Sequence, residues 1–346
     1  MTNGGDSKPL RCAVVGLGYW GPNLVRVLHE IPEAEVAYAC DLEPERLGRI
    51  GTRFPAVKLT TDYEEILADD SVDAVLIATK VYSHHPLAKA ALEAGKHVFV
   101  EKPMAASSEQ ALELIEMANE RELTLMPGHT FLYSPPVNKC RELIQSGELG
   151  EVYFISMSRV NLGLHQPDVS VIWDLGPHDF SILRYWLEET PLRVSAICRG
   201  CIVESIPDVA FIDLEFPSRM LAHVELSWLA PSKLRRTTIV GSRRMVIYDD
   251  TSNEPVRVFD SGVDVPNPET FGEFRMTYRV GDIVSPNIEV TEPLRCELAD
   301  FCTAVRSGSE PRSSARLGLD VVRIAEAVDT SIRTGASVTP TPRVPA

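Results

Sequence analysis

The sequence predicts an α/β protein in which an N-terminal, doubly wound parallel sheet precedes an α+β domain with a large, open, mostly antiparallel sheet. In residues 1–127, short apolar runs alternate with segments of helical spacing, which is the pattern of strand–helix–strand units. From residue 151 onward, strand-like runs follow one another directly, which indicates antiparallel pairing. The length of 346 residues also favours two domains. We therefore expect domains at 1–127 and 128–346, with 334–346 as a loose tail.

The N-terminal half contains six expected strands separated by helices. The strands are expected at 10–15, 36–40, 57–59, 74–77, 97–100 and 123–126, and the helices at 22–30, 44–51, 63–68, 87–94 and 108–121. Right-handed crossovers make such strands parallel, so their carboxyl ends meet at one edge of the sheet. Candidate ligand-binding residues are therefore sought directly after each strand.

Composition excludes several classes of protein. The net charge of −15 disfavours nucleic acid and anionic membrane as partners. No apolar run approaches the ~20 residues of a membrane span. The N-terminus lacks the basic and apolar regions of a secretion signal, so we expect a cytoplasmic protein. Cys198 and Cys201 form one isolated C-x-x-C without a nearby histidine, so no metal site is expected.

A glycine turn joins the first expected strand to the first helix. Gly16 permits the tight turn, Gly18 allows a pyrophosphate to approach the backbone, and Gly21 allows the helix to pack against the strand. Tyr19 and Trp20 lie inside this turn and are expected beside the same ligand. The free N–H groups of the helix N-terminus would then bind the phosphates of a dinucleotide.

Asp41 follows the second expected strand, 20 residues after Gly21. A carboxylate at this distance binds the adenosine ribose hydroxyls and repels a 2′-phosphate, which favours NAD over NADP. Arg46 lies close enough in sequence to accommodate that phosphate instead. Alternatively, Asp41 caps the helix at 44–51.

Glu101-Lys102-Pro103 directly follows the fifth expected strand. A lysine at the carboxyl end of a parallel strand faces the ligand crevice, where its charge is partly desolvated. Glu101 can hold its ammonium group, and Pro103 ends the strand. The alternative is an ordinary solvated lysine.

A second chemical cluster is expected in the C-terminal half. Asp174 and His178 are four residues apart across an expected strand-to-helix turn, where Pro177 suits the first turn of the helix. Histidine titrates near neutral pH, and an adjacent carboxylate fixes its orientation, which suits a general base. Alternatively, His178 is only a hydrogen-bonded residue at a helix start.

Several polar residues are candidates for substrate binding. Arg159, Asn161 and His165 lie in a polar loop after the first long strand of the second domain, and polar loops often hold ligands. His129 and Tyr133 stand at the start of that domain. Trp173 and Trp228 are expected to pack, or to lie at an interface, rather than to stack on a sugar.

The segment from Ala78 to Pro103, together with the glycine turn and Asp41, resembles the glucose-fructose oxidoreductase / inositol dehydrogenase / MocA family. The resemblance implies an N-terminal Rossmann domain, a C-terminal sheet domain that forms a homodimer or homotetramer, and pyridine-nucleotide chemistry on sugars and cyclitols. It also implies cofactor contacts at Thr79, His84, Glu101 and Lys102. Asp174 and His178 match the family's D-x-x-x-H pattern.

We expect an NAD-dependent enzyme that oxidises a secondary hydroxyl, or reduces its ketone, with C3 of an amino sugar or aminoglycoside favoured. Lys102 would bind the reacting oxygen, and either His178 or a desolvated Lys102 would be the base. Asp174 would orient His178 or bind a neighbouring hydroxyl. A cationic substrate would suit the acidic chain. The alternatives are an NAD-dependent glycosidase with transient oxidation, a cyclitol dehydrogenase and a non-catalytic NAD-binding regulator.

Overall fold

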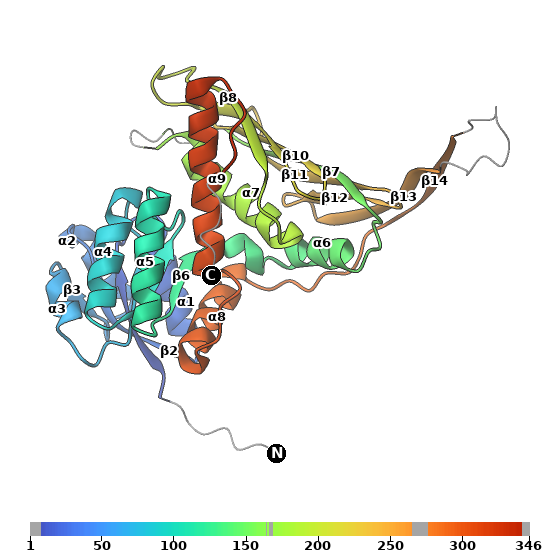
Figure 1. Ribbon diagram of the computed structural model, residues 1–346. Helices are drawn as coiled ribbons and strands as arrows, with labels where there is room; N and C mark the ends of the chain where they lie inside the picture. Colours follow the sequence, from blue (N-terminus) through green and yellow to red (C-terminus); the bar gives the residue numbers. More distant parts are fainter. Residues whose placement is uncertain (1–7, 164, 166–168, 265–275, 341–346) are drawn as a thin grey trace, which may run out of the picture. The chain divides into compact units, whose positions relative to one another are not determined.

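The computed structural model describes residues 8–163, 165, 169–264 and 276–340 (Figure 1). The chain forms two compact units. The first contains the chain up to Tyr133 together with Thr291–Val322, and the second contains Ser134–Val290 and the chain from Arg323 onward. The expected boundary after residue 127 therefore differs from the observed division, because residues 291–322 return to the first unit. Among the described residues, no helix is both long and apolar enough to cross a membrane.

The first unit contains a six-stranded parallel sheet in the order β3-β2-β1-β4-β5-β6. Its strands are β1 (Leu10–Val15), β2 (Ala34–Cys40), β3 (Lys58–Thr60), β4 (Ala74–Ile77), β5 (His97–Glu101) and β6 (Leu125–Gly128). The strand order reverses between β1 and β4, and ligands bind at such a switch point in doubly wound sheets. The expected fold class is confirmed.

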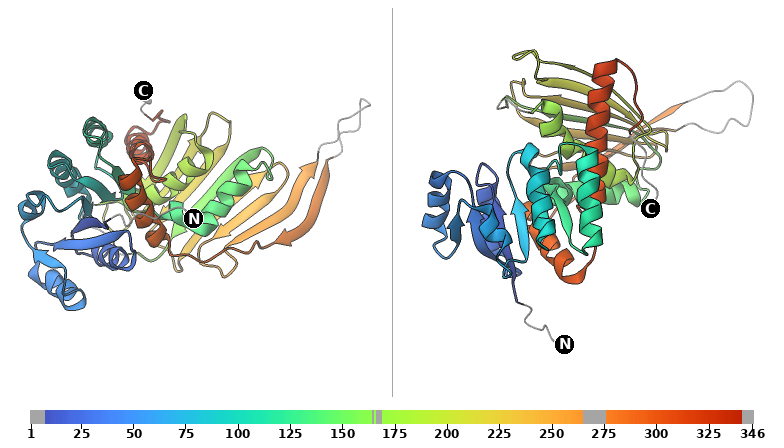
Figure 2. Two further views of the ribbon diagram at one scale, coloured as in Figure 1. Left: turned by 90° about the horizontal axis from the view of Figure 1, so that it is seen from below. Right: turned by 60° about the vertical axis from the view of Figure 1, so that its left-hand side comes forward.

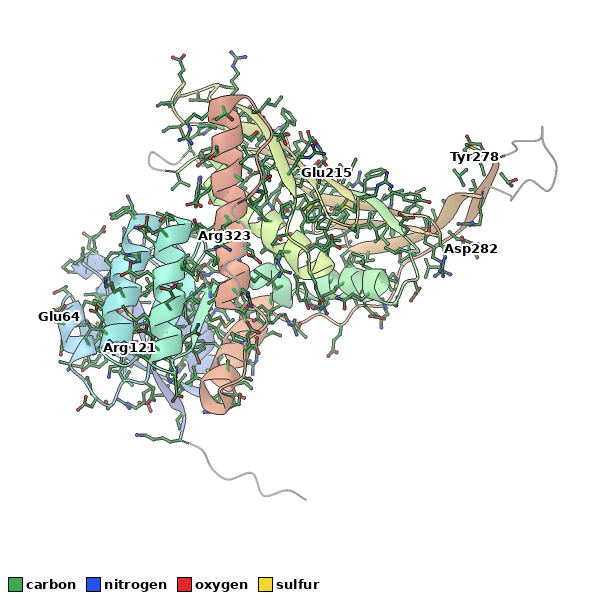
Figure 3. All side chains as sticks on the ribbon, viewed as in Figure 1. Glu64, Arg121, Glu215, Tyr278, Asp282 and Arg323 are labelled. Atoms are coloured by element: carbon green, nitrogen blue, oxygen red, sulfur yellow. The ribbon has the colours of Figure 1, made fainter. Side chains whose placement is uncertain are left out.

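Helices cover both faces of this sheet (Figure 2). They are α1 (Gly21–Glu30), α2 (Pro44–Arg53), α3 (Tyr63–Leu67), α4 (Val81–Glu93), α5 (Ser108–Glu120), the 3₁₀ helix η1 (Thr130–Tyr133) and α8 (Pro293–Ser307). Buried side chains of α3, α4 and α5 pack against one face through a shared apolar core, and α1 packs against α8. Charged residues such as Glu64 on α3 and Arg121 after α5 are exposed (Figure 3).

The second unit contains an eight-stranded sheet in the order β14-β13-β12-β11-β7-β10-β9-β8. Its strands are β7 (Val152–Val160), β8 (Arg193–Arg199), β9 (Val209–Glu215), β10 (Leu221–Ser227), β11 (Leu234–Gly241), β12 (Met245–Asp249), β13 (Val256–Asp264) and β14 (Thr277–Val284). Only β7 and β10 pair in parallel among these strands, so the sheet is mostly antiparallel. Tyr278 and Asp282 mark the exposed edge strand β14 (Figure 3).

Two helices, α6 (Pro135–Gln145) and α7 (Val171–Leu187), pack on one face of this sheet. The sequence places the start of the second helix at Pro177, but Val171 and Ile172 are fully buried and extend it by six residues, leaving Pro177 inside. The helix α9 (Ala315–Thr334) precedes the C-terminal segment. Val338 pairs with Val194 through two backbone hydrogen bonds of 2.8 Å, so the tail expected to be loose is anchored up to this point.

Candidate active site

The glycine turn leaves space for a phosphate beside its backbone. Gly16 has a φ of +91°, and a Cβ there would lie 2.6 Å from Thr79. A Cβ on Gly21 would lie 1.9 Å from the Gly16 oxygen, so the start of α1 can approach β1 only without a side chain. A Cβ on Gly18 would contact nothing within 4 Å. The turn is therefore tightly closed at its two ends and open in the middle, as dinucleotide binding requires.

Asp41 is fixed next to this turn by three groups. Its Oδ2 atom accepts a 2.6 Å hydrogen bond from the Leu17 N–H, and its Oδ1 atom accepts one of 2.9 Å from the Glu43 N–H. Arg46 lies 3.4 Å from Oδ2 and also pairs with Glu43 at 2.9 Å. Glu43, rather than Asp41, is the N-cap residue of α2, so the alternative explanation of Asp41 as the cap is wrong. The buried carboxylate is held at the end of β2, where a ribose would bind.

His84 joins the loop after β4 to the segment after β5. Its Nδ1 atom lies 2.8 Å from the Pro103 oxygen, and its Nε2 atom lies 3.1 Å from the Thr79 oxygen. Burial lowers the pKa of His84, and the two carbonyl groups act in the opposite direction. Both ring nitrogens are thus used within the protein. The expected direct cofactor contact of His84 stays a prediction, whereas its support of Thr79 and Pro103 is structural.

Lys102 stands directly after β5, half-buried, as the sequence predicts. Glu101 is the last residue of β5, and its Oε2 atom accepts a 3.4 Å hydrogen bond from the Lys102 backbone N–H. Burial raises the pKa of Glu101 to about 7, and the charge of Lys102 partly offsets this rise. The two side chains therefore interact electrostatically, but Glu101 is too deeply buried to be an ordinary surface partner.

His129 and Tyr133 belong to the first unit, not to the second as the sequence predicts. Desolvation lowers the pKa of His129 to about 3, and the Lys102 charge adds to this effect, so the buried ring is neutral. The Tyr133 hydroxyl donates to Asp300 at 2.7 Å and accepts the Ser313 N–H at 3.1 Å. The Tyr133 hydroxyl is therefore buried and both donates and accepts within the unit, which argues against the predicted substrate contact.

In the second unit, Asp174 and His178 lie on one face of α7. Both residues are inside the helix, four positions apart, rather than across a strand-to-helix turn. The Trp228 indole N–H donates a 3.2 Å hydrogen bond to Asp174 Oδ2. His165 packs edge-on against the same indole at 5.3 Å between ring centres, and its Nε2 atom lies 3.5 Å from Asp208. Trp228 therefore combines packing with a polar contact that orients Asp174.

Arg159 has a different place from the one expected. Its Nε and Nη2 atoms each donate a 2.8 Å hydrogen bond to the Asp179 carboxylate, and both residues are buried. This pair joins β7 to α7, so we interpret Arg159 as a structural residue. Asn161 continues β7 through a backbone bond of 3.1 Å from its N–H to Ser227, and it stays a predicted substrate contact. Residues 164 and 166–168 of the expected polar loop lie outside the described residues.

The sequence does not identify Trp228 and Asp208 in the second unit, or Glu297 in the first unit, as functional candidates. A buried indole N–H usually needs a hydrogen-bond partner, and this is what the sequence could have indicated about Trp228. Asp208 is fully buried and accepts the backbone N–H groups of Cys201 and Ile202. Glu297, on α8, is also fully buried and accepts a 2.7 Å hydrogen bond from Thr130.

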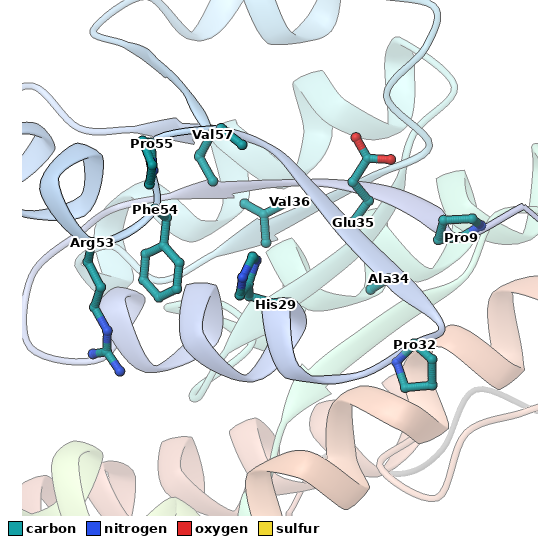
Figure 4. A pocket seen from close by; sticks show the side chains of 11 residues that line it. Pro9, His29, Pro32, Ala34, Glu35, Val36, Arg53, Phe54, Pro55 and Val57 are labelled. Carbon is teal, nitrogen blue, oxygen red and sulfur yellow. The ribbon is translucent and has the colours of Figure 1, made fainter.

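A cavity of about 400 Å³ in the first unit lies elsewhere (Figure 4). It is formed at the start of β2 and the ends of α1 and α2, with His29, Arg53 and Phe54 among its lining residues. These residues are at the amino end of β2, opposite the strand ends that carry Asp41 and Lys102. We therefore do not assign this cavity to the cofactor.

Two family models match the chain consecutively. Residues 10–129 match the oxidoreductase family with an NAD-binding Rossmann fold, and residues 137–247 match the GFO/IDH/MocA C-terminal domain. The chain belongs to the GFO/IDH/MocA family. It is an oxidoreductase, and its first unit is the NAD-binding Rossmann part of that family.

Relatives of this family member include proteins with several named activities. The myo-inositol 2-dehydrogenase of Thermotoga maritima is 24% identical, over 95% of this chain and 98% of its own. The structure resembles that of GenD2 from gentamicin A biosynthesis in complex with NAD, with a TM-score of 0.81, 24% identity, and 98% of each chain covered. It also resembles the UDP-N-acetylglucosamine 3-dehydrogenase GnnA of Acidithiobacillus ferrooxidans, with a TM-score of 0.79, 24% identity, and 95% and 99% covered.

Proposed function

We propose that this family member is an NAD-dependent dehydrogenase that interconverts a secondary hydroxyl and a ketone on a sugar-like substrate. The observation that carries the proposal is the position of Lys102 directly after β5. The carboxyl ends of parallel strands share one edge, and that edge also carries the glycine turn and Asp41. A cationic side chain beside a dinucleotide-binding turn can stabilise negative charge on a reacting oxygen.

The preference for NAD is supported by the environment of Asp41. Its carboxylate is fixed where it would accept ribose hydroxyls and repel a 2′-phosphate. Arg46, the side chain that could accept this phosphate, already pairs with Asp41 and Glu43. Binding NADP would require Arg46 to leave both carboxylates.

The cofactor supplies the hydride acceptor, and the protein supplies position and proton transfer. We assign Lys102 to the reacting oxygen and His178 to the hydroxyl proton, with Lys102 as the alternative base. Asp174 orients His178 or binds a neighbouring hydroxyl, and Trp228 fixes Asp174 by its indole N–H. Asn161 and His165 are the remaining proposed substrate contacts.

We propose an amino sugar as the substrate class, with oxidation at C3 favoured. The named activities of GnnA and the biosynthetic setting of GenD2 support this choice, and the net charge of −15 suits a cationic substrate. The named activity of the Thermotoga maritima relative supports the cyclitol alternative.

A substrate panel with NAD and NADP tests the proposal. Aminoglycosides, nucleotide-linked amino sugars, myo-inositol and simple aldoses are each incubated with the protein while NADH absorbance is recorded. We expect turnover of amino sugars with NAD. Turnover of only cyclitols or aldoses would reject the substrate class, and release of a free sugar without net NADH would indicate the glycosidase.

The catalytic assignment is tested by Lys102→Ala, with Lys89→Ala, a change at another half-buried lysine, as control. Loss of an electrostatic group at the reacting oxygen is expected to reduce kcat by roughly 10²–10³-fold. The control should retain wild-type turnover, because Lys89 on α4 forms an ion pair with Glu113 on α5. Full activity of Lys102→Ala would refute the mechanism.

We also propose that the protein forms a homodimer or homotetramer through the open sheet of the second unit. Phe154 and Leu221 are neighbours across β7 and β10, and Ile197 and Phe211 are neighbours across β8 and β9. All four side chains are exposed. Exposed apolar residues grouped in this way indicate an interaction surface. Sedimentation of wild type and Leu221→Lys should show an assembly that the substitution weakens, whereas a monomeric wild type would contradict the proposal.

A further inference from the structure

Three buried titratable side chains gather behind Lys102 in the first unit. Glu101, His129 and Glu297 are each almost or fully buried. Glu101 Oε1, Glu297 Oε1 and both ring nitrogens of His129 have no hydrogen-bond partner among the described residues. Buried polar atoms are rarely left in this state unless they serve a function or bind a small species.

The packing of β5 against α8 brings the two glutamates together. Phe99 and Phe301 contact each other edge-on at 5.8 Å between ring centres. Glu101 lies two residues after Phe99 and therefore on the same face of β5, and Glu297 lies four residues before Phe301 on the same face of α8. The negative charge of Glu101 also contributes to the raised pKa of Glu297, in agreement with this packing.

Gly128 makes room for the Glu101 carboxyl group. It is the register partner of Glu101 across β5 and β6, and a Cβ there would lie 3.2 Å from both Cδ and Oε1 of Glu101. The residues after Gly128 complete this site, because Thr130 donates to Glu297 Oε2 at 2.7 Å. The site is thus built from three separate segments of the first unit.

A metal ion does not explain this site, because the described residues contain no group of three or more His, Cys, Asp or Glu side chains arranged to hold one. Two ionised carboxylates in this position would be desolvated and would repel each other. Burial raises the pKa of Glu101 to about 7 and that of Glu297 well above its usual range. Binding a proton would reduce both the desolvation penalty and the repulsion between the two carboxylates.

We propose that Glu101 and Glu297 share one proton at neutral pH and form a proton-holding pair beside Lys102, which makes Glu297 a further functional residue. Lys102 after β5 and the Trp20 indole before α1 face Glu101, and Asp300 on α8 faces Glu297. His129 after β6 lies close enough to Lys102 for that charge to lower the histidine pKa further. Glu297 acts through Glu101 and does not contact the substrate.

The role of the carboxyl pair rests on the proposed dehydrogenase function, because the pair would take part in the proton transfer of that reaction. A bound nicotinamide would accept the electron pair and hydrogen of the C–H bond as hydride, and the hydroxyl proton would pass to the base as the O–H bond breaks. Two carboxyl groups that hold one proton can accept a second. The pair can therefore take up the proton that Lys102 releases when Lys102 acts as the base, and return it during reduction.

Infrared difference spectroscopy between neutral and alkaline pH tests the shared proton without any turnover. The wild type should show a protonated-carboxyl band at pH 7 that disappears as pH rises. Glu297→Gln and Glu101→Gln should each change this band, whereas the exposed Glu310→Gln should leave it unchanged. Absence of the band from the wild type at pH 7, or a band that neither variant alters, would overturn the proposal; the wild-type spectrum is decisive even if a variant fails to fold.

The pH profile of kcat/KM then separates a proton-holding role from simple packing. We expect Glu297→Gln to move one limb of the profile by at least ~0.5 pH unit while its Kd for NAD stays within threefold of wild type, since it replaces a titrating group with a neutral one. A profile that superimposes on wild type would refute the role of Glu297. The proposed function fails separately: an active Lys102→Ala that retains the carboxyl band would refute the mechanism but not the acid pair.

Discussion

The buried ion pair between Arg159 and Asp179 allows a strong test of whether Arg159 is a structural residue, as the structure indicates, or a substrate ligand, as the sequence predicts. Arg159→Met keeps the length of the side chain but removes both 2.8 Å hydrogen bonds. Asp179, which is 2% exposed, would keep a negative charge without this partner. Removing one member of a buried ion pair costs about 3–5 kcal/mol of unfolding free energy. Urea unfolding followed by fluorescence and circular dichroism measures this loss.

A matched control uses an ion pair at the surface of the same sheet. Arg193 on β8 pairs with Glu215 on β9, but the two side chains are 61% and 37% exposed. Arg193→Met should cost only about 0–1 kcal/mol, because water screens such a pair. The double variant Arg159→Met/Asp179→Leu should recover most of the stability that Arg159→Met loses, since it leaves no buried charge unpaired.

The kinetics of the same variants distinguish the two roles considered for Arg159. A substrate ligand would raise KM when removed and leave unfolding almost unchanged. If Arg159→Met unfolds within about 1 kcal/mol of wild type but raises KM more than ~10-fold, Arg159 binds substrate and the structural interpretation is wrong.

Three further predictions concern the candidate site. Trp228→Phe removes the indole N–H that donates to Asp174 and should reduce kcat/KM by roughly 10–100-fold. Trp186→Phe, whose indole N–H donates to the Val137 oxygen, is an equally buried control that should lose a similar stability and leave kcat/KM unchanged; equal effects on kcat/KM would contradict this assignment. Asp41→Ala should lower the selectivity for NAD over NADP at least ~10-fold, because the repelling carboxylate is lost and Arg46 is released; unchanged selectivity would place the ribose elsewhere. Burial raises the pKa of Glu101 from 4.5 to about 7, so the wild type should lose roughly 3 kcal/mol of stability as pH rises through this window. Glu297, whose pKa is also raised, adds a loss of its own in the same window, so Glu101→Gln should lose roughly 3 kcal/mol less than the wild type in unfolding measured from pH 4 to 8. Parallel curves would refute this contribution of Glu101.

The proposed cofactor-binding residues can be predicted from the sequence, because in a parallel sheet their positions depend only on where each strand ends. Gly16, Asp41 and Lys102 directly follow an apolar strand, and Thr79 follows one after a single residue. The edge on which they lie therefore follows from strand direction alone. Close approaches such as the one at Gly21 need only a short turn and are also visible in the sequence.

The remaining features depend on partners distant in the chain. The sequence alone indicates a polar loop residue at Arg159, because its partner Asp179 lies 20 positions away. The hydrogen bond between Trp228 and Asp174 likewise joins residues 54 positions apart. The strand β14 has no clear signal in the sequence, because nearly all of its residues are exposed and no alternation of buried and exposed positions marks it. Pro177 indicated a helix start, but burial of Val171 and Ile172 outweighs the cost of a proline inside α7.

Helix α7 connects the structural pair to the proposed chemistry. Asp174 and His178 are four positions apart and share one face, whereas Asp179 is rotated by about 100° from His178. The two hydrogen bonds that Arg159 on β7 donates to Asp179 therefore fix the rotation of α7 about its axis. This rotation in turn sets the direction of the two proposed catalytic side chains. An activity loss in Arg159→Met that arises in this way should appear in kcat. It should also be recovered in Arg159→Met/Asp179→Leu, because the apolar pair restores the packing of α7 on β7. A KM defect that the double variant retains would show instead that the guanidinium group itself binds substrate.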